Sequence, residues 1–176
     1  MSADPMALGR VVPPAIGECE TMSSAKQIGI NALKANAALA PLAFLLGEWR
    51  TMGTHPGVPG QTLEGRTSFA WHEGGAFLIM RSEVDHPEFP DGVAIFSADR
   101  DAGSLAMNWF DERGVSRLYQ VTAGDRSMRW HRDDPRLAQR ATIVAGGDGD
   151  RLVSKGQMSL DGADWSVDLS QIFTRG

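Results

Sequence analysis

The sequence has one cysteine, Cys19, in 176 residues. A single thiol excludes an intrachain disulfide, and it excludes a metal cage built from several thiolates. The chain also lacks a run of basic residues, and its formal net charge is −5. We therefore expect neither nucleic acid nor an anionic membrane surface as a partner.

Long apolar runs are lacking as well. No stretch approaches the ~20 consecutive apolar residues that a membrane-spanning helix needs. The first residues, Met1 to Arg10, do not show the basic start and apolar core of a secretory signal. We therefore expect a cytoplasmic protein.

Recognisable catalytic motifs are missing too. The chain has no Gly-X-Ser-X-Gly nucleophile elbow, no phosphate-binding glycine loop ahead of a helix, and no cysteine–histidine pair placed for nucleophilic attack. Its four histidines show none of the short spacings of a metal site. The sequence thus predicts no catalytic residue and no metal site, and it favours a binding protein over an enzyme.

Turn-forming residues, by contrast, are frequent: the chain has 20 glycines and 9 prolines. Most of them separate short segments, which is typical of an all-β chain. The length fits one domain with a core or a lined cavity, and the hydrophobic content of 42% is ordinary for a globular protein.

The chain divides into three predicted parts. Residues 1–23 carry scattered prolines without a period, which predicts a loose N-terminal arm. Residues 24–40 are rich in Ala, Leu and Lys and predict a short helix, capped by Ser23 or Ser24 and ended by Pro41. Residues 41–176 form the main domain.

The main domain predicts about ten short strands at hairpin spacing. The first is expected at Leu45–Arg50 and the last at Trp165–Phe173. No gap is long enough for a crossover, so neighbours in sequence should pair antiparallel, and pairing of the last strand with the first removes both sheet edges. The predicted fold is all-β, an antiparallel meander closed into a barrel wide enough for a small ligand or a plug of large side chains.

The stretch Phe44-Leu45-Leu46-Gly47-Glu48-Trp49 resembles the opening strand of lipocalin-like and fatty-acid-binding-protein-like domains of the calycin group. Other stretches resemble one uncharacterised bacterial family of lipocalin-like proteins, namely Trp71–Leu78, Phe110–Arg117, and Asp161-Gly162 with Trp165 and Phe173–Arg175. The resemblance covers residues 42–175. It implies a calycin-like barrel in which Trp49 plugs the closed end.

The chain is also distantly similar to nitrobindin, a haem-binding barrel. That protein shares the Gly-X-Trp opening, continues with alternating glycines, and holds haem through a histidine near its C-terminus. Here Arg50–Gly53 keeps one of those glycines, and residues 168–175 contain no histidine. His72 and His131 lie at predicted strand ends beside Trp71 and Trp130, so if haem or a metal binds, one of them is the ligand to test first.

Five tryptophans are spread over the predicted strands. A tryptophan buries a large surface and still needs a partner for its indole N–H. We assign Trp49 and Trp165 to the core. Trp71, Trp109 and Trp130 are expected to form the walls of a ligand pocket.

Several polar residues interrupt the apolar strands. An inward Arg81 needs an acidic partner or an anionic ligand, and the alternative is an outward, solvated Arg81. Asn108 and Tyr119 raise the same question, because both faces of these strands carry apolar residues. The predicted ligand-binding residues are Trp71, Arg81, Asn108, Trp109, Tyr119, Trp130 and His131. A surface salt-bridge network is predicted around one turn, from Asp111, Glu112, Arg113 and Arg117.

Three functions remain open. The first is binding of a small hydrophobic molecule, with polar groups orienting it at the mouth of the barrel. The second is a haem-binding enzyme similar to nitrobindin, which the missing histidine in the last strand disfavours. The third is a homodimeric interaction module without a ligand.

Overall fold

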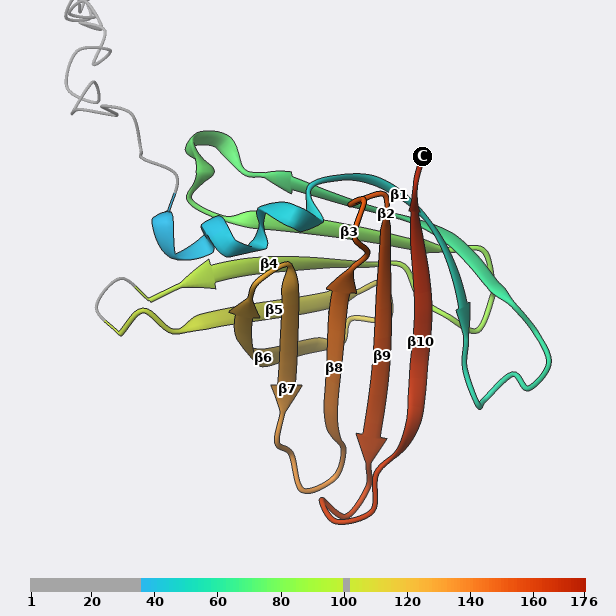
Figure 1. Ribbon diagram of the computed structural model, residues 1–176. Coiled ribbons are helices and arrows are strands. Elements are labelled where there is room, and N and C mark those ends of the chain that lie inside the picture. The colour runs from blue at the N-terminus through green and yellow to red at the C-terminus, as the bar shows by residue number, and fades with distance from the viewer. Residues whose placement is uncertain (1–35, 100–101) are drawn as a thin grey trace, which may run out of the picture. The chain divides into compact units, whose positions relative to one another are not determined.

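The computed structural model describes residues 36–99 and 102–176. In these residues the chain forms ten strands and two short 3-10 helices, and neither helix is long and apolar enough to cross a membrane. Figure 1 shows the elements, which are η1 Ala37–Leu45, β1 Gly47–Thr54, β2 Leu63–Trp71, η2 Glu73–Gly75, β3 Leu78–Val84, β4 Gly92–Ala98, β5 Leu105–Asp111, β6 Ser116–Gly124, β7 Ser127–Arg132, β8 Ala138–Ala145, β9 Arg151–Ser159 and β10 Ser166–Arg175.

The strands close into a barrel. Each strand pairs antiparallel with the next one, and β1 pairs with β10 over a register that places Trp49 opposite Arg175. This closure leaves no sheet edge to template pairing with another chain. The predicted all-β, ten-stranded antiparallel barrel is therefore confirmed.

The start of the chain differs from the prediction. The expected arm at 1–23 and most of the expected helix at 24–40 lie outside the described residues. The described helix η1 does not end at Pro41 but passes through it to Leu45, so β1 begins at Gly47 and not at Leu45. Our prediction that Pro41 terminates the helix was wrong.

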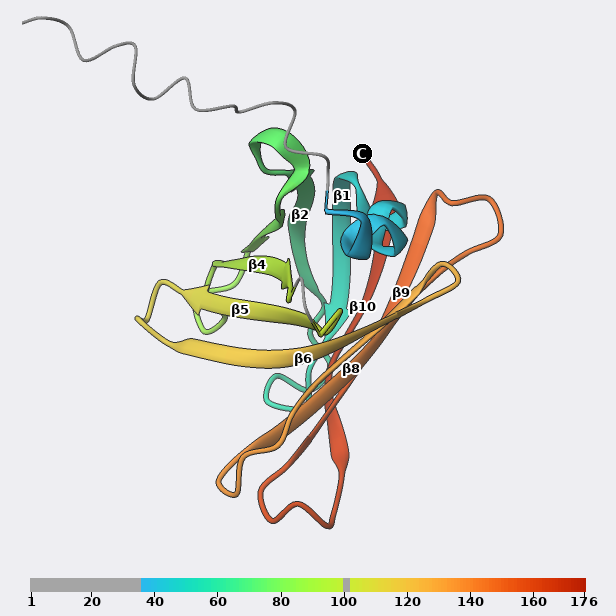
Figure 2. The same ribbon diagram turned by 90° about the vertical axis from the view of Figure 1, so that its left-hand side faces the viewer.

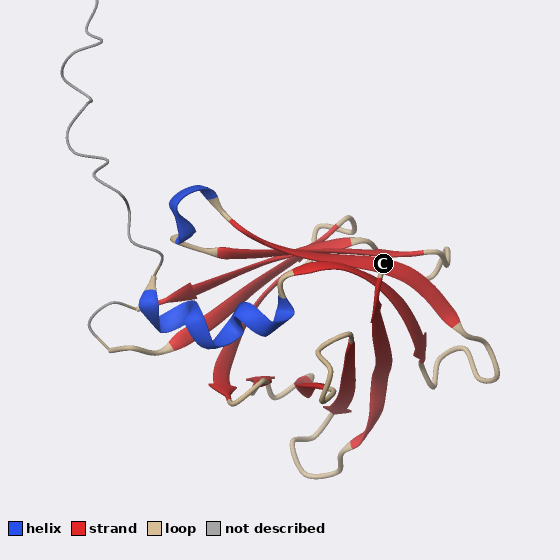
Figure 3. Cartoon of the chain, turned by 45° about the horizontal axis from the view of Figure 1, so that its top comes forward, coloured by secondary structure: helices blue, strands red, loops and turns tan. Residues whose placement is uncertain are grey.

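Burial explains why η1 continues past Pro41. A 3-10 helix has three residues per turn, so Leu39, Leu42 and Leu45 fall on one face. All three are fully buried in the core of the barrel. The apolar area that they remove from water outweighs the hydrogen bond that the proline cannot donate. Figure 3 shows η1 lying across one end of the barrel.

The same end is fastened by Trp49, Arg175 and Gly47. The indole Nε1 of buried Trp49 donates to the Leu45 carbonyl at 2.7 Å, and the Arg175 guanidinium lies 4.1 Å above the indole ring. Arg175 also donates to the Leu46 carbonyl at 2.5 Å. Gly47 has φ +116°, and a Cβ there would lie 2.1 Å from Arg175 Nη1, so this position requires glycine. Figure 2 shows that η1 and the end of β10 share this end of the barrel.

Trp165 departs from its predicted place. It is half-exposed and outside the core cluster, with the Arg140 guanidinium 3.9 Å above its ring. The cause is a register shift in β10 between Val167 and Ser170, where β10 carries one residue more than β9. Such a bulge reverses which residues point inward. Trp165 therefore does not share the inward face of Phe173.

Candidate functional site

A cavity of about 450 Å³ lies inside the barrel, within the range of small-ligand pockets. Its lining includes residues from the β1–β2 and β3–β4 loops and from the β5–β6 turn, which lie at the end opposite η1. The mouth of the cavity is therefore at that end. Most of the wall is apolar, with large side chains contributed by Met80, Phe96, Met107, Trp109, Met128, Trp130, Ile143 and Phe173.

Alternation along the strands decides which predicted residues reach the cavity. Trp109, Tyr119 and Trp130 line it. Their strand neighbours point to the other side, because successive side chains face opposite ways. Accordingly Arg81, Asn108 and His131 alternate with the lining residues Met80, Trp109 and Trp130 and are themselves absent from the lining. Trp71 is half-buried and packs against the core, but it is not part of the cavity wall.

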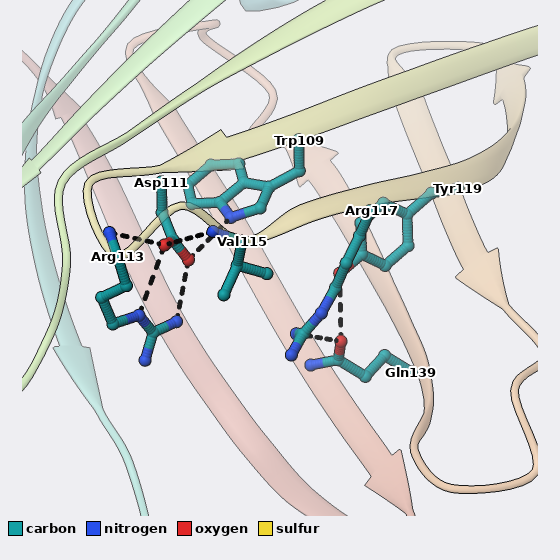
Figure 4. Close-up of polar contacts among 7 residues, drawn as sticks. All are labelled: Trp109, Asp111, Arg113, Val115, Arg117, Tyr119 and Gln139. Carbon is teal, nitrogen blue, oxygen red and sulfur yellow. Dashed lines mark hydrogen bonds and ion pairs between the residues drawn. The ribbon is translucent and has the colours of Figure 1, made fainter.

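A chain of hydrogen bonds crosses the polar side of the cavity. The amide of Gln139 on β8 connects its two ends, because Nε2 donates to Asp168 at 3.1 Å while Oε1 accepts from Tyr119 at 3.0 Å. Arg117 also donates to this Oε1, at 2.8 Å. Figure 4 shows the Arg117, Tyr119 and Gln139 side chains converging. Three strands thus place one connected polar surface inside an otherwise apolar wall.

Asp168 reaches this surface because of the bulge in β10. Before the shift the exposed Val167 points outward, and after it Leu169, Gln171 and Phe173 line the cavity, with Asp168 lining it as well. Gly156 on β9 permits the close approach, since a Cβ there would lie 2.6 Å from the Leu169 carbonyl oxygen. The sequence pattern missed Asp168 because a strict alternation places it on the outside.

His55, in the loop after β1, completes the chain of bonds. Its Nδ1 accepts from the Gly57 amide at 3.0 Å, so the neutral ring carries its proton on Nε2. That nitrogen faces Asp168 Oδ1 at 2.9 Å and donates to it. Both ring nitrogens are therefore occupied, and His55 has no lone pair free for a metal or for proton abstraction.

A second histidine loop narrows the mouth. His86 accepts the Glu88 amide proton on Nδ1 at 3.2 Å, as His55 does with Gly57, and its Nε2 lies 3.3 Å from Gln61 Oε1. Phe89 makes edge-to-face contacts with both rings, at centroid distances of 5.0 and 5.3 Å. Phe89 lines the cavity, so this aromatic group covers part of the entrance.

The β5–β6 turn supplies a charged rim. The Asp111 side chain is 1% exposed and accepts from Arg113 Nη2 at 2.8 Å, from the Arg113 amide at 3.0 Å, and weakly from Trp109 Nε1 at 3.5 Å (Figure 4). These bonds, the one from the Arg113 guanidinium first, hold the pKa of Asp111 below its usual range against the opposing effect of burial. The predicted surface network is thus an Asp111–Arg113 pair at the mouth.

Arg117 takes no part in that rim network. It is half-buried and lines the cavity, and within the described ranges no carboxylate lies within ion-pairing distance of it. Its hydrogen-bond partner is the neutral amide of Gln139. The pKa of Tyr119 is raised by burial, and the neighbouring Arg117 works in the opposite direction. The cavity therefore contains a guanidinium that forms no direct ion pair with a carboxylate of the described residues.

The residues around the cavity do not fit haem ligation. Neither His72 nor His131 lines the cavity, and His55, the histidine that does, has both nitrogens bonded. His72 is exposed beside Phe77, and His131 lies 3.9 Å from Asp133 on the outer side of β7. Across 36–99 and 102–176 no cluster of three or more metal-binding side chains occurs.

Comparison with known proteins supports the fold and gives no function. No protein-family model matches the chain, and no curated protein matches it. The crystal structure of Rv2717c from M. tuberculosis is similar with a TM-score of 0.57 and 18% sequence identity, over 80% of this chain and 98% of that one. At this identity the likeness concerns the barrel architecture alone.

Proposed function

We propose that the barrel binds a small, largely apolar molecule with an anionic end, as a binding protein of the lipocalin-like type. The observation that carries the proposal is Arg117, a half-buried guanidinium without a carboxylate partner in a cavity walled mainly by methionine and aromatic side chains. A buried charge without a partner is costly, and an anionic group on the ligand removes that cost.

The hydrogen-bonded side chains on the polar side of the cavity orient such a ligand. Tyr119 and Gln139 are already bonded to each other, and Gln139 is bonded to Asp168, so their positions are set before binding. Asp168 and Arg117 lie at opposite ends of this series of hydrogen bonds. The carboxylate of Asp168 repels an anion, whereas the guanidinium of Arg117 attracts one. The anionic end of the ligand therefore lies against Arg117, and its apolar part extends among the methionines.

Quenching of tryptophan fluorescence tests the proposal, because Trp109 and Trp130 line the cavity. The probes are dodecanoic acid and dodecanol, which have the same chain and differ in charge. We expect both to quench, with the acid binding more tightly than the alcohol by about tenfold or more, since a charge-assisted contact contributes about 1.5–3 kcal/mol and 1.4 kcal/mol is a factor of about ten.

Arg117→Gln separates the two parts of the proposal. The variant should lose the preference for the acid and keep binding of the alcohol. Arg81→Gln, on the outer side of β3, is the matched control and should bind both as the unmodified chain does. Absence of quenching by either probe contradicts the binding function, and an acid preference that survives in Arg117→Gln contradicts the role of Arg117.

A further inference from the structure

The outer side of the barrel carries a straight apolar row across four neighbouring strands. The register places Met52 on β1 opposite Ile172 on β10, Ile172 opposite Val153 on β9, and Val153 opposite Val144 on β8. Met52, Ile172 and Val144 are 57%, 38% and 46% exposed. Strands lie about 4.8 Å apart, so the row is about 14 Å long. A shallow hollow borders it, lined in part by Thr54, Thr142 and Val167.

Positive charge flanks this row along its sides, while the exposed Glu64 on β2 lies opposite Met52 at one end. Five exposed cations occupy outward positions of β1, β9, β8 and β7, namely Arg50, Arg151, Lys155, Arg140 and Arg129. Glu48 is the single acidic side chain among the outward positions of β1 and β7–β10. Together the five cations and the apolar row form what we call the basic face. Figure 1 shows β7, β8, β9 and β10 side by side on this part of the barrel.

The cations of the basic face have no acidic partners there. None of the ion pairs among the described residues includes Arg50, Arg129, Arg151 or Lys155. Arg140 bonds to the neutral Gln157 and lies over Trp165. The whole chain carries a net charge of −5, so this concentration of cations is local and opposite in sign to the total. Successive side chains of a strand face opposite sides of the sheet, so these cations gather on the outer side while the residues between them face inward.

Contrary to the expectation drawn from the net charge, we propose that the basic face docks on a membrane surface containing anionic lipids. Such a surface offers negative headgroups to the cations and an apolar boundary into which short aliphatic side chains can dip. A second copy of this face is disfavoured, because the cations of the two copies would face each other. Nucleic acid would use the cations and leave the apolar row exposed to water. The inference does not depend on what the cavity binds.

Sedimentation with lipid vesicles tests the proposal. Vesicles of phosphatidylcholine with about 30% phosphatidylglycerol should bind the full chain at low salt, vesicles of phosphatidylcholine alone should not, and binding should weaken as salt rises. Equal binding to both vesicles, or to neither, overturns the proposal. Binding to duplex DNA but not to the anionic vesicles also overturns it.

Two variants connect binding to the face. Arg151→Glu combined with Lys155→Glu should weaken vesicle binding by about tenfold or more, because each cation near an anionic surface raises the binding constant severalfold. Met52→Ser combined with Ile172→Ser should weaken it without changing its salt dependence. The control is Arg81→Glu with Arg136→Glu, which makes the same change in net charge at exposed positions elsewhere. Thermal unfolding verifies that each variant folds, and an equal loss in the control overturns the assignment to this face.

Discussion

The side chains of His55 and Asp168 meet at 2.9 Å although 113 residues separate them in the chain. The contact joins the loop after β1 to the bulge of β10. Asp168 thereby bonds to His55 at the mouth of the cavity and to Gln139 on its polar wall, and so connects the two.

Asp168→Asn should lower the free energy of unfolding by on the order of 1–2 kcal/mol. A carboxylate accepts from both His55 and Gln139, whereas an amide has one oxygen and turns an N–H toward the second donor. Urea unfolding measures the change. Asp164→Asn, on the exposed β9–β10 loop, is the control and should leave the midpoint unchanged. Equal effects of the two substitutions would show that the Asp168 contact does not stabilise the fold.

Ala141→Phe should block the cavity. Ala141 is 5% exposed and lines the cavity wall on β8. A phenyl ring there fills space that the ligand needs, so the affinity for dodecanol measured by tryptophan quenching should fall by about tenfold or more. The overpacked core should lower the free energy of unfolding by about 1–3 kcal/mol. Thr142→Phe places the same ring on the outer side of the same strand. Quenching that persists in Ala141→Phe would mean that the probe binds outside the barrel.

Tyr119 gives a direct electrostatic test because it is the single tyrosine in the sequence. Burial raises its pKa above the ordinary value of 10.0, so the absorbance of tyrosinate in the folded protein should develop with a midpoint above that value. The folded state then holds the proton more tightly than the unfolded state, and stability should fall as pH rises through this range. Arg117→Gln removes the opposing effect of the guanidinium and should move the midpoint higher. A midpoint at or below 10.0 contradicts the burial of the hydroxyl.

Gly47→Ala should destabilise the closed end of the barrel by about 1–3 kcal/mol, because φ at this position is unfavourable for any residue with a Cβ. The added carbon also displaces Arg175 from its place over Trp49. Gly147→Ala serves as control, since a Cβ there meets no atom within 4 Å. Thermal unfolding of the two variants, compared with the unmodified chain, measures the difference.

The strands were predictable because alternation and turn residues mark each hairpin locally. The first strand was the exception. Its expected start at Leu45 was wrong, since three leucines at threefold spacing prefer a buried 3-10 turn across the barrel end. Whether a short apolar run forms helix or strand depends on what lies beside it in the fold, which the run itself does not contain.

The site was predictable in part. Trp109, Tyr119 and Trp130 are large residues in strands, and the structure places them in the cavity wall. The prediction missed Asp168, and it misplaced Trp165, for one reason: a bulge of one residue reverses the alternation that the prediction assumes. His55 was not among the predicted ligand-binding residues. The repeated His-Pro pair at His55 and His86 was the available signal, because both rings accept the amide proton two residues later.

Because η1 covers one end of the barrel, the described residues leave one opening to the cavity, at the opposite end. A ligand must then dissociate through the opening by which it entered. Two ligands cannot pass each other there, so one must dissociate before the next can bind. Competitors added in excess should therefore leave the release rate of a bound ligand unchanged. The mouth of the cavity at Phe89, rather than the depth of the cavity, would then set the residence time of a bound ligand.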